Sequence, residues 1–406
     1  MQVIGVIRAA LGALFVGSIL VGQAAAAPAF DRWVEGFWPQ ARSAGISRSL
    51  YTQVFKGMTP DPEILRRAEN QPEFTQAVWS YLDRAVSDRR IKNGTEAEAE
   101  WSAWLDTIEK RYGVSRYTVV AIWGMESSYG HILDNPKIVR GTIRSLATLA
   151  YDGGKRKKFG RTQLIAALKI LQNGDVHHSK MTGSWAGAMG HTQFIPTTYQ
   201  AYAVDITGDG KRDIWNSVPD ALASTAAYLK ASGWETGKTW GYEVQLPSGF
   251  NYALANKKSA RSLGEWETLG ITRANGSAFP RKSDHAKLYL PAGSKGPAFL
   301  TLKNFDVIKR YNNSNSYALA VGHLGDRILG VSSFQASWPR NDTPLSFSER
   351  KQLQQLLSRN GYPVGKIDGR IGPGSQSAIR KYQLARGMTP DGYDSKLLLE
   401  RLKREN

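Results

Sequence analysis

A glutamate on the apolar face of a predicted helix is the residue of this sequence best suited to acid–base chemistry. Glu126 follows Ile122 by four residues and Val119 by seven, so a helix would place its carboxyl on an apolar stripe. Desolvation favours the protonated carboxyl there, and the negative end of the helix dipole acts in the same direction. General-acid cleavage of a glycosidic bond requires such an acid. The alternative is a buried glutamate paired with an Arg or Lys, and the helix alone does not decide between the two.

A second segment, residues 184–196, has the composition of a ligand-contacting loop. It combines small residues, a glutamine and aromatic residues in one turn-rich run. Glycines would let the backbone approach a ligand closely, and Gln193 can hydrogen-bond sugar hydroxyls or an N-acetyl group through both its donor and its acceptor atoms. The same residues would equally suit a loop that packs tightly against a helix.

Helical periodicity dominates the chain from residue 30 to about residue 233. It predicts one helix over residues 96–111 and another over residues 219–231. A third helix, with Ser115 as its N-cap, would carry Glu126 near its C-terminal end. The segments that must position the glutamate are therefore helices.

The pattern changes after residue 240. Short strands are predicted at residues 242–246, 287–290 and 298–300, between turns rich in Gly, Pro and Ser. Helical periodicity returns over residues 304–329, and residues 337–344 have the composition of a linker.

Three motifs together resemble the lytic murein transglycosylases, specifically the membrane-bound lytic transglycosylase B family. They are residues 126–130 (ESSYG), residues 187–190 (GAMG) with 193–196 (QFIP), and residues 310–318 (RYNNSNSYA). The resemblance covers roughly residues 30–338. It implies a mainly α protein, with a lysozyme-like helical catalytic domain and a small β-containing subdomain. It also implies cleavage of the β-1,4 bond between N-acetylmuramic acid and N-acetylglucosamine.

The resemblance further implies a role for individual residues. Glu126 would be the single catalytic acid and base, first protonating the leaving oxygen and then taking the proton of the muramoyl C6 hydroxyl as that hydroxyl attacks C1. The product would be a 1,6-anhydro sugar. The residues that would line the substrate groove are Ser184, Gln193, Asn312, Tyr317, Tyr228 and Tyr81.

Two other functions stay open at this point. An ordinary glycosidase needs a second carboxylate, and none lies inside the motifs, although distant residues such as Asp134 or Asp152 could fold nearby. A muramidase would hydrolyse the same bond with water. A non-catalytic cell-wall-binding protein would retain Glu126 only as a structural residue.

Residues 205–213 resemble a calcium-binding loop, with Asp at the first and fifth positions and Gly at the sixth. The twelfth position is Asn216 instead of glutamate, so the standard EF-hand pattern is broken, and the family resemblance implies a longer loop that closes on a later aspartate. The implied ligands are Asp205, Thr207, Asp209, Lys211 and Asp220. The alternative is an Asp/Gly-rich turn held by its own hydrogen bonds. We expect no required cofactor and, if a metal binds, a weakly held structural Ca²⁺.

The C-terminal segment, residues 345–402, resembles the peptidoglycan-binding domain type 1, a three-helix module of cell-wall enzymes. Two Asp-Gly turns, Asp368-Gly369 and Asp391-Gly392, fall at its helix junctions. A tethered binding module would raise the effective concentration of the catalytic domain on an insoluble polymer. The alternative is a stabilising helical cap with no ligand of its own.

The N-terminus has the layout of a secretory signal peptide, with Arg8, an apolar stretch and four alanines before Pro28. The apolar stretch of about 14 residues is short of the ~20 that a membrane-spanning helix needs, so we expect cleavage and a periplasmic protein. The chain contains no cysteine, unlike the lipidated members of the family. Its formal net charge of +18 indicates an anionic partner, and export favours peptidoglycan glycan strands over nucleic acid.

We therefore expect four segments in the 406 residues. These are a signal peptide (1–26), a catalytic domain (27–338), a linker (339–345) and a peptidoglycan-binding domain (346–406). The mature protein is expected to be a monomer without a stable membrane anchor.

Overall fold

The computed structural model describes residues 14–69, 76–255 and 260–405, with side chains from residue 29 onward except at residue 69. Residues 1–13 of the predicted signal peptide therefore lie outside the described residues, and residues 14–26 are described only as backbone of the first helix. In the described part of the chain, no helix is both long and apolar enough to cross a membrane.

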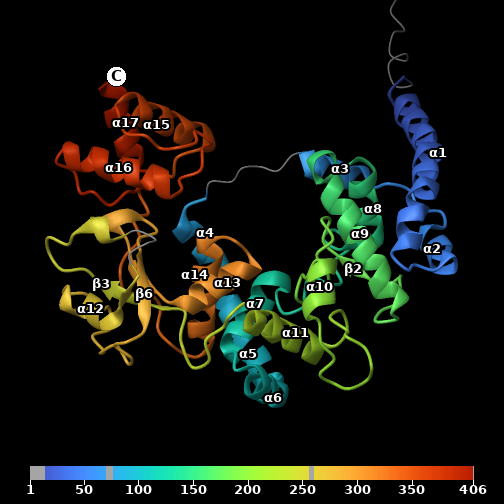
Figure 1. Ribbon diagram of the computed structural model, residues 1–406, viewed down its shortest axis with the longest axis horizontal. Helices are drawn as coiled ribbons and strands as arrows, with labels where there is room; N and C mark the ends of the chain where they lie inside the picture. The colour runs from blue at the N-terminus through green and yellow to red at the C-terminus, as the bar shows by residue number, and fades with distance from the viewer. Residues whose placement is uncertain (1–13, 70–75, 256–259, 406) are drawn as a thin grey trace, which may run out of the picture. The chain divides into compact units, whose positions relative to one another are not determined.

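The chain forms two compact units. One comprises Met1–Gln71 and His131–Ala221, and the other comprises Pro72–Gly130 and Leu222–Asn406. The first is mainly helical, and the second combines helices with a β-sheet (Figure 1). The predicted fold class, mainly α with a small β-containing part, is confirmed.

The first unit is built around two helices, α8 (Thr142–Asp152) and α9 (Lys157–Gln172), which pack along each other. They approach closely because α9 carries Gly160, where a Cβ atom would come within 2.5 Å of the backbone nitrogen of Ala150 in α8. The other elements of this unit are α1 (Leu14–Ser43), α2 (Arg48–Phe55), α3 (Pro62–Glu69), β1 (Arg140–Gly141), η1 (Gly154–Arg156), β2 (Thr182–Gly183), α10 (Pro196–Tyr202) and the first residues of α11 (Val218–Ala231).

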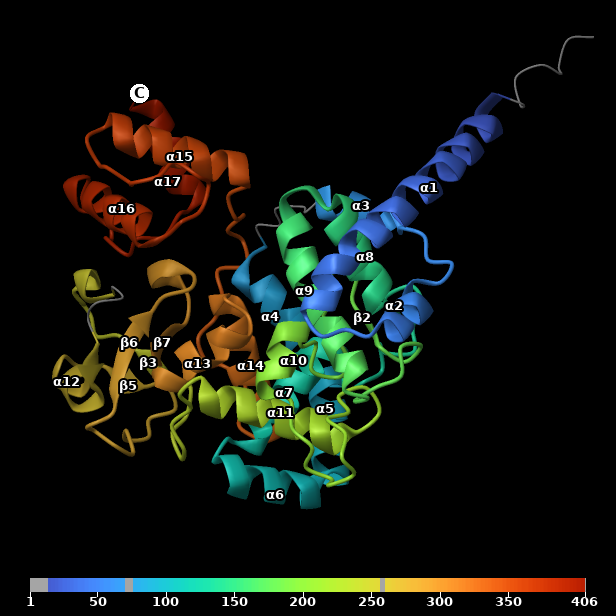
Figure 2. The ribbon, with the colours of Figure 1, turned by 45° about the vertical axis from the view of Figure 1, so that its right-hand side comes forward.

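The helical part of the second unit surrounds a buried helix, α7, which packs against α5 and α14 (Figure 2). Its helices are α4 (Val78–Ala85), α5 (Asp88–Glu100), α6 (Ser102–Tyr112), α7 (Arg116–Ser127), α13 (Lys303–Tyr311) and α14 (Asn315–Ile328), together with the rest of α11. The single helix predicted over residues 96–111 is wrong, because the helix is interrupted at Trp101. Ser115 occupies the N-cap position of α7, as predicted. Within the described residues, its side chain accepts no hydrogen bond from the first backbone N–H groups of the helix. The carboxylate of Glu109 instead accepts a hydrogen bond from Arg116 N at 3.2 Å.

The predicted strands are confirmed and form an antiparallel sheet in the order β4-β6-β7-β3-β5. Its strands are β3 (Gly241–Gln245), β4 (Arg261–Ser262), β5 (Thr272–Arg273), β6 (His285–Tyr289) and β7 (Ala298–Thr301), and the short helices beside them are η2 (Tyr252–Leu254), α12 (Leu263–Thr268) and η3 (Gly293–Lys295). In the register, Val244 of β3 faces Ala298 of β7. Helix α12 packs on the sheet through Trp266, which is fully buried and donates to the carbonyl of Ala286 at 3.0 Å.

The C-terminal part of the second unit is a three-helix module. Its helices are α15 (Phe347–Arg359), α16 (Pro373–Ala385) and α17 (Lys396–Arg404). A buried glutamine fixes each Asp-Gly turn: Gln354 accepts from Gly369 N at 2.8 Å, and Gln383 accepts from Gly392 N at 2.9 Å. Both turns are therefore held from inside the module.

The segment before the module has no regular secondary structure, as its composition predicts, but it is pinned to the rest of the unit. Glu243 of β3 accepts from the backbone nitrogens of Gln335 and Ala336, both at 2.8 Å. Arg340 forms a two-pronged ion pair with Asp83 of α4, at 2.7 and 3.0 Å. The segment is therefore held at two points by polar contacts.

Candidate functional site

The C-terminal end of α7 is closed by three consecutive residues in the left-handed region: Ser128 (φ 52°), Tyr129 (φ 59°) and Gly130 (φ 87°). Two of them are not glycine, and such a backbone persists only where surrounding contacts enforce it. Here the ring of Tyr129 folds back onto Gly124, where any Cβ atom would clash with it, and its hydroxyl donates to the carbonyl of Arg90 at 2.8 Å. This turn fixes the last turn of α7, which carries Glu126.

The carboxyl of Glu126 meets a buried tyrosine. Tyr317, which is 3% exposed, donates its hydroxyl hydrogen to Glu126 Oε1 at 2.6 Å. Tyr317 lies in the first turn of α14, whose N-cap Ser314 accepts from Tyr317 N at 3.3 Å. The cap and the helix start thus set the position of the phenol.

Burial raises the pKa of Glu126 to about 7, and the hydrogen bond from Tyr317 lowers it in part. In the described part of the chain, no Lys or Arg forms an ion pair with this carboxylate, and no second carboxylate perturbs its pKa. The ion-paired alternative raised by the sequence therefore has no support among these residues. A carboxyl with a pKa near 7 can both donate and accept a proton at neutral pH.

The other predicted site residues of the second unit differ in whether they lie near Glu126 and Tyr317. Tyr81 of α4 is close to the carboxyl: burial raises the pKa of Tyr81, and the charge of Glu126 raises it further. Tyr228 of α11 instead donates to the carbonyl of Arg310 at 2.5 Å. Asn312 is exposed in the turn between α13 and α14. The structure therefore brings Tyr81 and Tyr317 to Glu126, whereas Tyr228 contacts the end of α13 and Asn312 lies in the turn that joins α13 to α14.

Ser184 and Gln193 lie in the first unit, in one compact loop. Gln193 has a left-handed backbone (φ 52°), and its side chain donates to the carbonyl of Gly190 at 2.8 Å. Ser184 Oγ accepts from Ala188 N at 3.2 Å. A Cβ atom on Gly190 would clash with the carbonyl of Ile214. The close backbone approach that we expected toward a ligand is thus made, at this glycine, toward the protein itself.

The predicted calcium loop, also in the first unit, brings three carboxylates together. Oxygens of Asp205, Asp209 and Asp220 all lie within 4.8 Å of one another. Asp220 is fully buried, and burial raises its pKa. Thr207 Oγ1 donates to Asp205 at 3.1 Å, and Lys211 N donates to Asp209 at 2.8 Å. Clustered carboxylates on a glycine-containing turn, one of them desolvated, fit the oxygen ligands of Ca²⁺.

Sequence reasoning missed Gly124 and Arg90, which hold the turn after Glu126. An isolated glycine inside an apolar helix is the available signal for Gly124, since such a glycine often marks a close packing contact. Arg90 contributes only its backbone carbonyl, so its side-chain type carries no signal.

Comparisons with known proteins agree with this organisation. Residues 29–326 match the Transglycosylase SLT domain family, and residues 347–402 match a peptidoglycan binding domain family. Among solved structures, SltB3 from Pseudomonas aeruginosa in complex with NAG-anhNAM-pentapeptide is 49% identical, with a TM-score of 0.87. That match covers 92% of this chain and 99% of SltB3.

More distant relatives match the larger part of the chain. Membrane-bound lytic murein transglycosylase B of Escherichia coli (strain K12) is 28% identical over 301 residues, which is 70% of this chain and 79% of the relative. The Escherichia coli lytic transglycosylase Slt35, solved in complex with calcium, is 25% identical with a TM-score of 0.60. That match covers 74% of this chain and 93% of Slt35.

Proposed function

We propose, because the chain belongs to the Transglycosylase SLT domain family and is a lytic transglycosylase, that Glu126 serves as its single acid and base. The bond cleaved is the β-1,4 linkage between N-acetylmuramic acid and N-acetylglucosamine. The observation that carries this proposal is a desolvated carboxyl, with a pKa of about 7, that meets the hydroxyl of Tyr317 at 2.6 Å.

The proposed reaction has two proton transfers. The protonated Glu126 first donates its proton to the glycosidic oxygen as the bond from C1 to that oxygen breaks. The carboxylate then takes the proton of the muramoyl C6 hydroxyl, and O6 forms a new bond to C1. The products are a glycan end with a free hydroxyl and a 1,6-anhydromuramoyl end, so no water is consumed. Tyr317 stabilises the intermediate carboxylate by donating a charge-assisted hydrogen bond.

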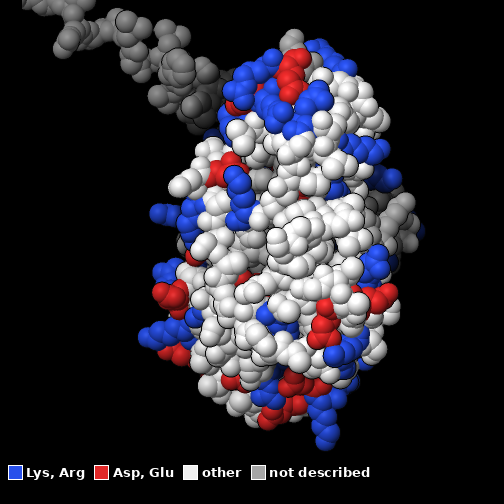
Figure 3. Space-filling model, turned by 90° about the vertical axis from the view of Figure 1, so that its left-hand side faces the viewer, with Lys and Arg blue, Asp and Glu red and all other residues white. Residues whose placement is uncertain are grey.

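The partner in this proposal is the peptidoglycan of the periplasm. SltB3, the relative of 49% identity, was solved with a peptidoglycan fragment, and the C-terminal module matches a peptidoglycan binding family. On the face shown in Figure 3, Lys and Arg side chains alternate with Asp and Glu around a broad area without charged side chains. That face therefore has no continuous basic stripe such as would follow a nucleic-acid backbone. The proposal includes a substrate groove lined by the six predicted residues. It also includes the division of the chain into signal peptide (1–26), catalytic domain (27–338), linker (339–345) and binding domain (346–406).

Digestion of purified sacculi followed by mass spectrometry tests the reaction. The mature protein is expected to release muropeptides that are lighter, by one water molecule, than those released by a muramidase. Products with reducing ends would instead show hydrolysis. An absence of soluble products, with binding to sacculi intact, would leave only a wall-binding role.

We also propose that the loop closing on Asp220 binds a structural Ca²⁺ through the five ligands given above. Slt35, a relative of 25% identity, was solved with calcium. When bound, the cation would neutralise the repulsion among the clustered carboxylates, one of which is fully buried.

Calcium is therefore expected to raise the melting temperature of the protein, and a chelator to lower it. Binding to the folded state alone stabilises by about 2.7 kcal/mol when free Ca²⁺ is a hundredfold above its dissociation constant. Asp220→Asn should abolish the response, because it removes a ligand charge but keeps an acceptor for Ile206 N. Differential scanning calorimetry with and without Ca²⁺ measures the shift, and Asp134→Asn, at an exposed site in the same unit, is the control. Equal melting temperatures with Ca²⁺ and with chelator would contradict the site.

A further inference from the structure

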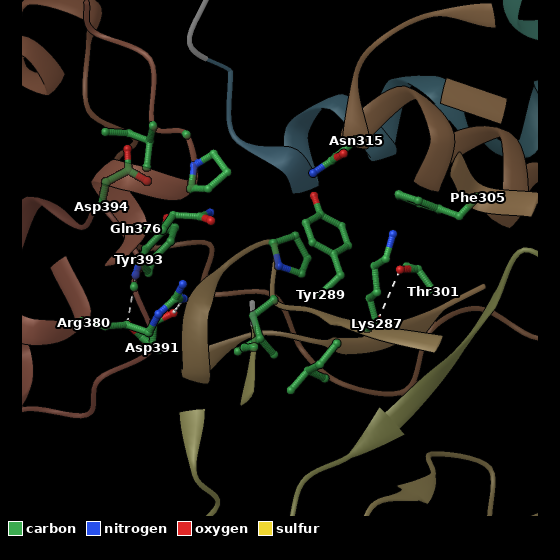
Figure 4. Close-up of a pocket in the computed structure, with 18 of the residues that line it drawn as sticks. Lys287, Tyr289, Thr301, Phe305, Asn315, Gln376, Arg380, Asp391, Tyr393 and Asp394 are labelled. Carbon is green, nitrogen blue, oxygen red and sulfur yellow. Dashed lines mark hydrogen bonds between the residues drawn. The ribbon is translucent and has the colours of Figure 1, made fainter. Parts of the chain in front are cut away.

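A cavity of about 410 Å³ lies in the second unit, between the β-sheet with α13 on one side and the C-terminal module on the other (Figure 4). Lys287 and Tyr289 of β6 line one wall, and Gln376 and Arg380 of α16 line the opposite wall. Its volume is in the range of small-molecule sites. Neither Glu126 nor any of the predicted groove residues lines it.

Arg380 brings an uncompensated positive charge to this cavity. Its guanidinium is partly buried, and in the described residues no carboxylate lies within ion-pair distance of it. Its hydrogen bond is to the backbone carbonyl of Asp391, at 3.4 Å. Burial lowers the pKa of Arg380, and the charge of Asp391 offsets this only in part. Gly392 makes room for the side chain, because a Cβ atom there would come within 2.6 Å of Arg380 Nη1.

The neighbouring carboxylate of Asp391 is engaged elsewhere. Its Oδ2 accepts from Ser294 N at 2.8 Å and from Ser294 Oγ at 2.9 Å, and its Oδ1 accepts from Gln383 at 2.8 Å and from Tyr393 N at 3.0 Å. A carboxylate with four donors already in place has little capacity to turn toward Arg380. The other N–H donors of the Arg380 guanidinium are therefore available to a different anion.

The other charges of the cavity are largely paired within it. Lys287 bonds Asp306 at 2.9 Å, and Arg350 bonds Asp394 at 2.8 Å. Counting all the lining residues, four are basic and three are acidic. The lining therefore carries one more basic than acidic side chain, and Arg380 forms no ion pair in the described structure.

We infer that this cavity binds a carboxylate of the peptidoglycan stem peptide, with Arg380 as its main contact. A guanidinium matches a carboxylate with two parallel hydrogen bonds. The repeating N-acetylglucosamine units are uncharged, so the stem peptides supply the polymer's main carboxylates. The amide of Gln376 lies in the cavity, where it can hydrogen-bond a peptide group, and the ring of Tyr289, whose hydroxyl is hydrogen-bonded to Asn315, lines the same cavity (Figure 4). The inference takes the identity of the polymer from the proposed function, but it does not depend on the chemistry at Glu126.

Titration calorimetry of the full chain with free stem pentapeptide tests the inference, because this probe has no glycosidic bond to cleave. Arg380→Ala is expected to weaken binding at least tenfold, and Arg380→Lys to weaken it less, since it keeps the charge but loses the fork. Amidation of the peptide's carboxylates should weaken binding to the wild type by a similar factor. Lys381→Ala is the matched control, because it removes the same charge from an exposed position on the same helix and should bind like the wild type.

Unchanged affinity in a folded Arg380→Ala variant would overturn the inference, as would inorganic phosphate that binds as tightly as the peptide. If Arg380→Ala does not fold, Gln376→Ala provides the same comparison, with a smaller expected loss of affinity. The mass-spectrometric assay distinguishes these results from failure of the proposed reaction. A protein that binds the peptide through Arg380 but releases no anhydro products would refute the reaction alone.

Discussion

Replacement of Glu126 by glutamine is expected to reduce the release of muropeptides from sacculi by roughly a thousandfold or more. The amide of glutamine can neither protonate the leaving oxygen nor take the proton of the C6 hydroxyl, so both proposed proton transfers are lost. Quantitative mass spectrometry of the soluble products over time measures the loss. Retention of more than a tenth of the activity would contradict the assignment of Glu126.

The stability of the same variant provides an internal control. The pKa of Glu126 is raised from 4.5 to about 7 in the folded protein, so the folded state binds more protons than the unfolded state between these values. The carboxyl therefore costs stability as the pH rises through this range. Glu126→Gln cannot ionise and should melt at or above the wild-type temperature at pH 8. Glu100→Gln, at an exposed glutamate that ends α5, should change neither activity nor melting temperature.

Tyr317→Phe is expected to lower the turnover rate by about 10- to 100-fold, because a hydrogen bond to a charged group contributes about 1.5–3 kcal/mol. The phenol is the hydrogen-bond partner of the Glu126 carboxyl, and phenylalanine keeps the ring but removes the donor. The carboxylate formed after the first proton transfer would then be left buried without this donor. Initial rates on soluble glycan fragments, at saturating substrate, measure the effect.

The pH profile separates this role from a purely structural one. The hydrogen bond from Tyr317 lowers the pKa of Glu126, so its removal raises that pKa further. Because the first step needs the protonated acid, the wild-type rate should fall as the pH rises through about 7, and the fall should occur at higher pH in Tyr317→Phe. Tyr228→Phe, whose hydroxyl bonds the carbonyl of Arg310 instead, should leave the position of this fall unchanged. An unshifted profile in Tyr317→Phe would show that the hydrogen bond does not tune the acid.

The helix that carries Glu126 could be predicted from sequence because its signal is local: an apolar stripe with one acid on it. The turn that follows could not, since left-handed Ser128 and Tyr129 are tolerated only where tertiary contacts enforce them. Those contacts come from Gly124 and from the carbonyl of Arg90, which lies 39 residues before Tyr129. The apolar environment of the acid could thus be predicted in part from the sequence, whereas the turn that fixes its position could not.

A similar limit applies to the segment before the C-terminal module. Its Pro, Asn and Ser content predicts a linker, and it does lack helix and strand. Its attachment depends on Asp83, 257 residues from Arg340, and on Glu243, 92 residues from Gln335. Composition reports the absence of regular structure, but it contains no information about partners so distant in sequence.

The hydrogen bonds from Ser294 to Asp391 limit how the C-terminal module could be exchanged between proteins of this kind. Ser294 belongs to the segment that matches the transglycosylase family, and Asp391 belongs to the segment that matches the peptidoglycan binding family. A module transplanted from another wall enzyme would bring its own core, but it would have to present an acceptor where Ser294 points. The two segments therefore form one contact with matched donors and acceptors. A substitution at Ser294 or Asp391 restricts which residues are compatible at the other position.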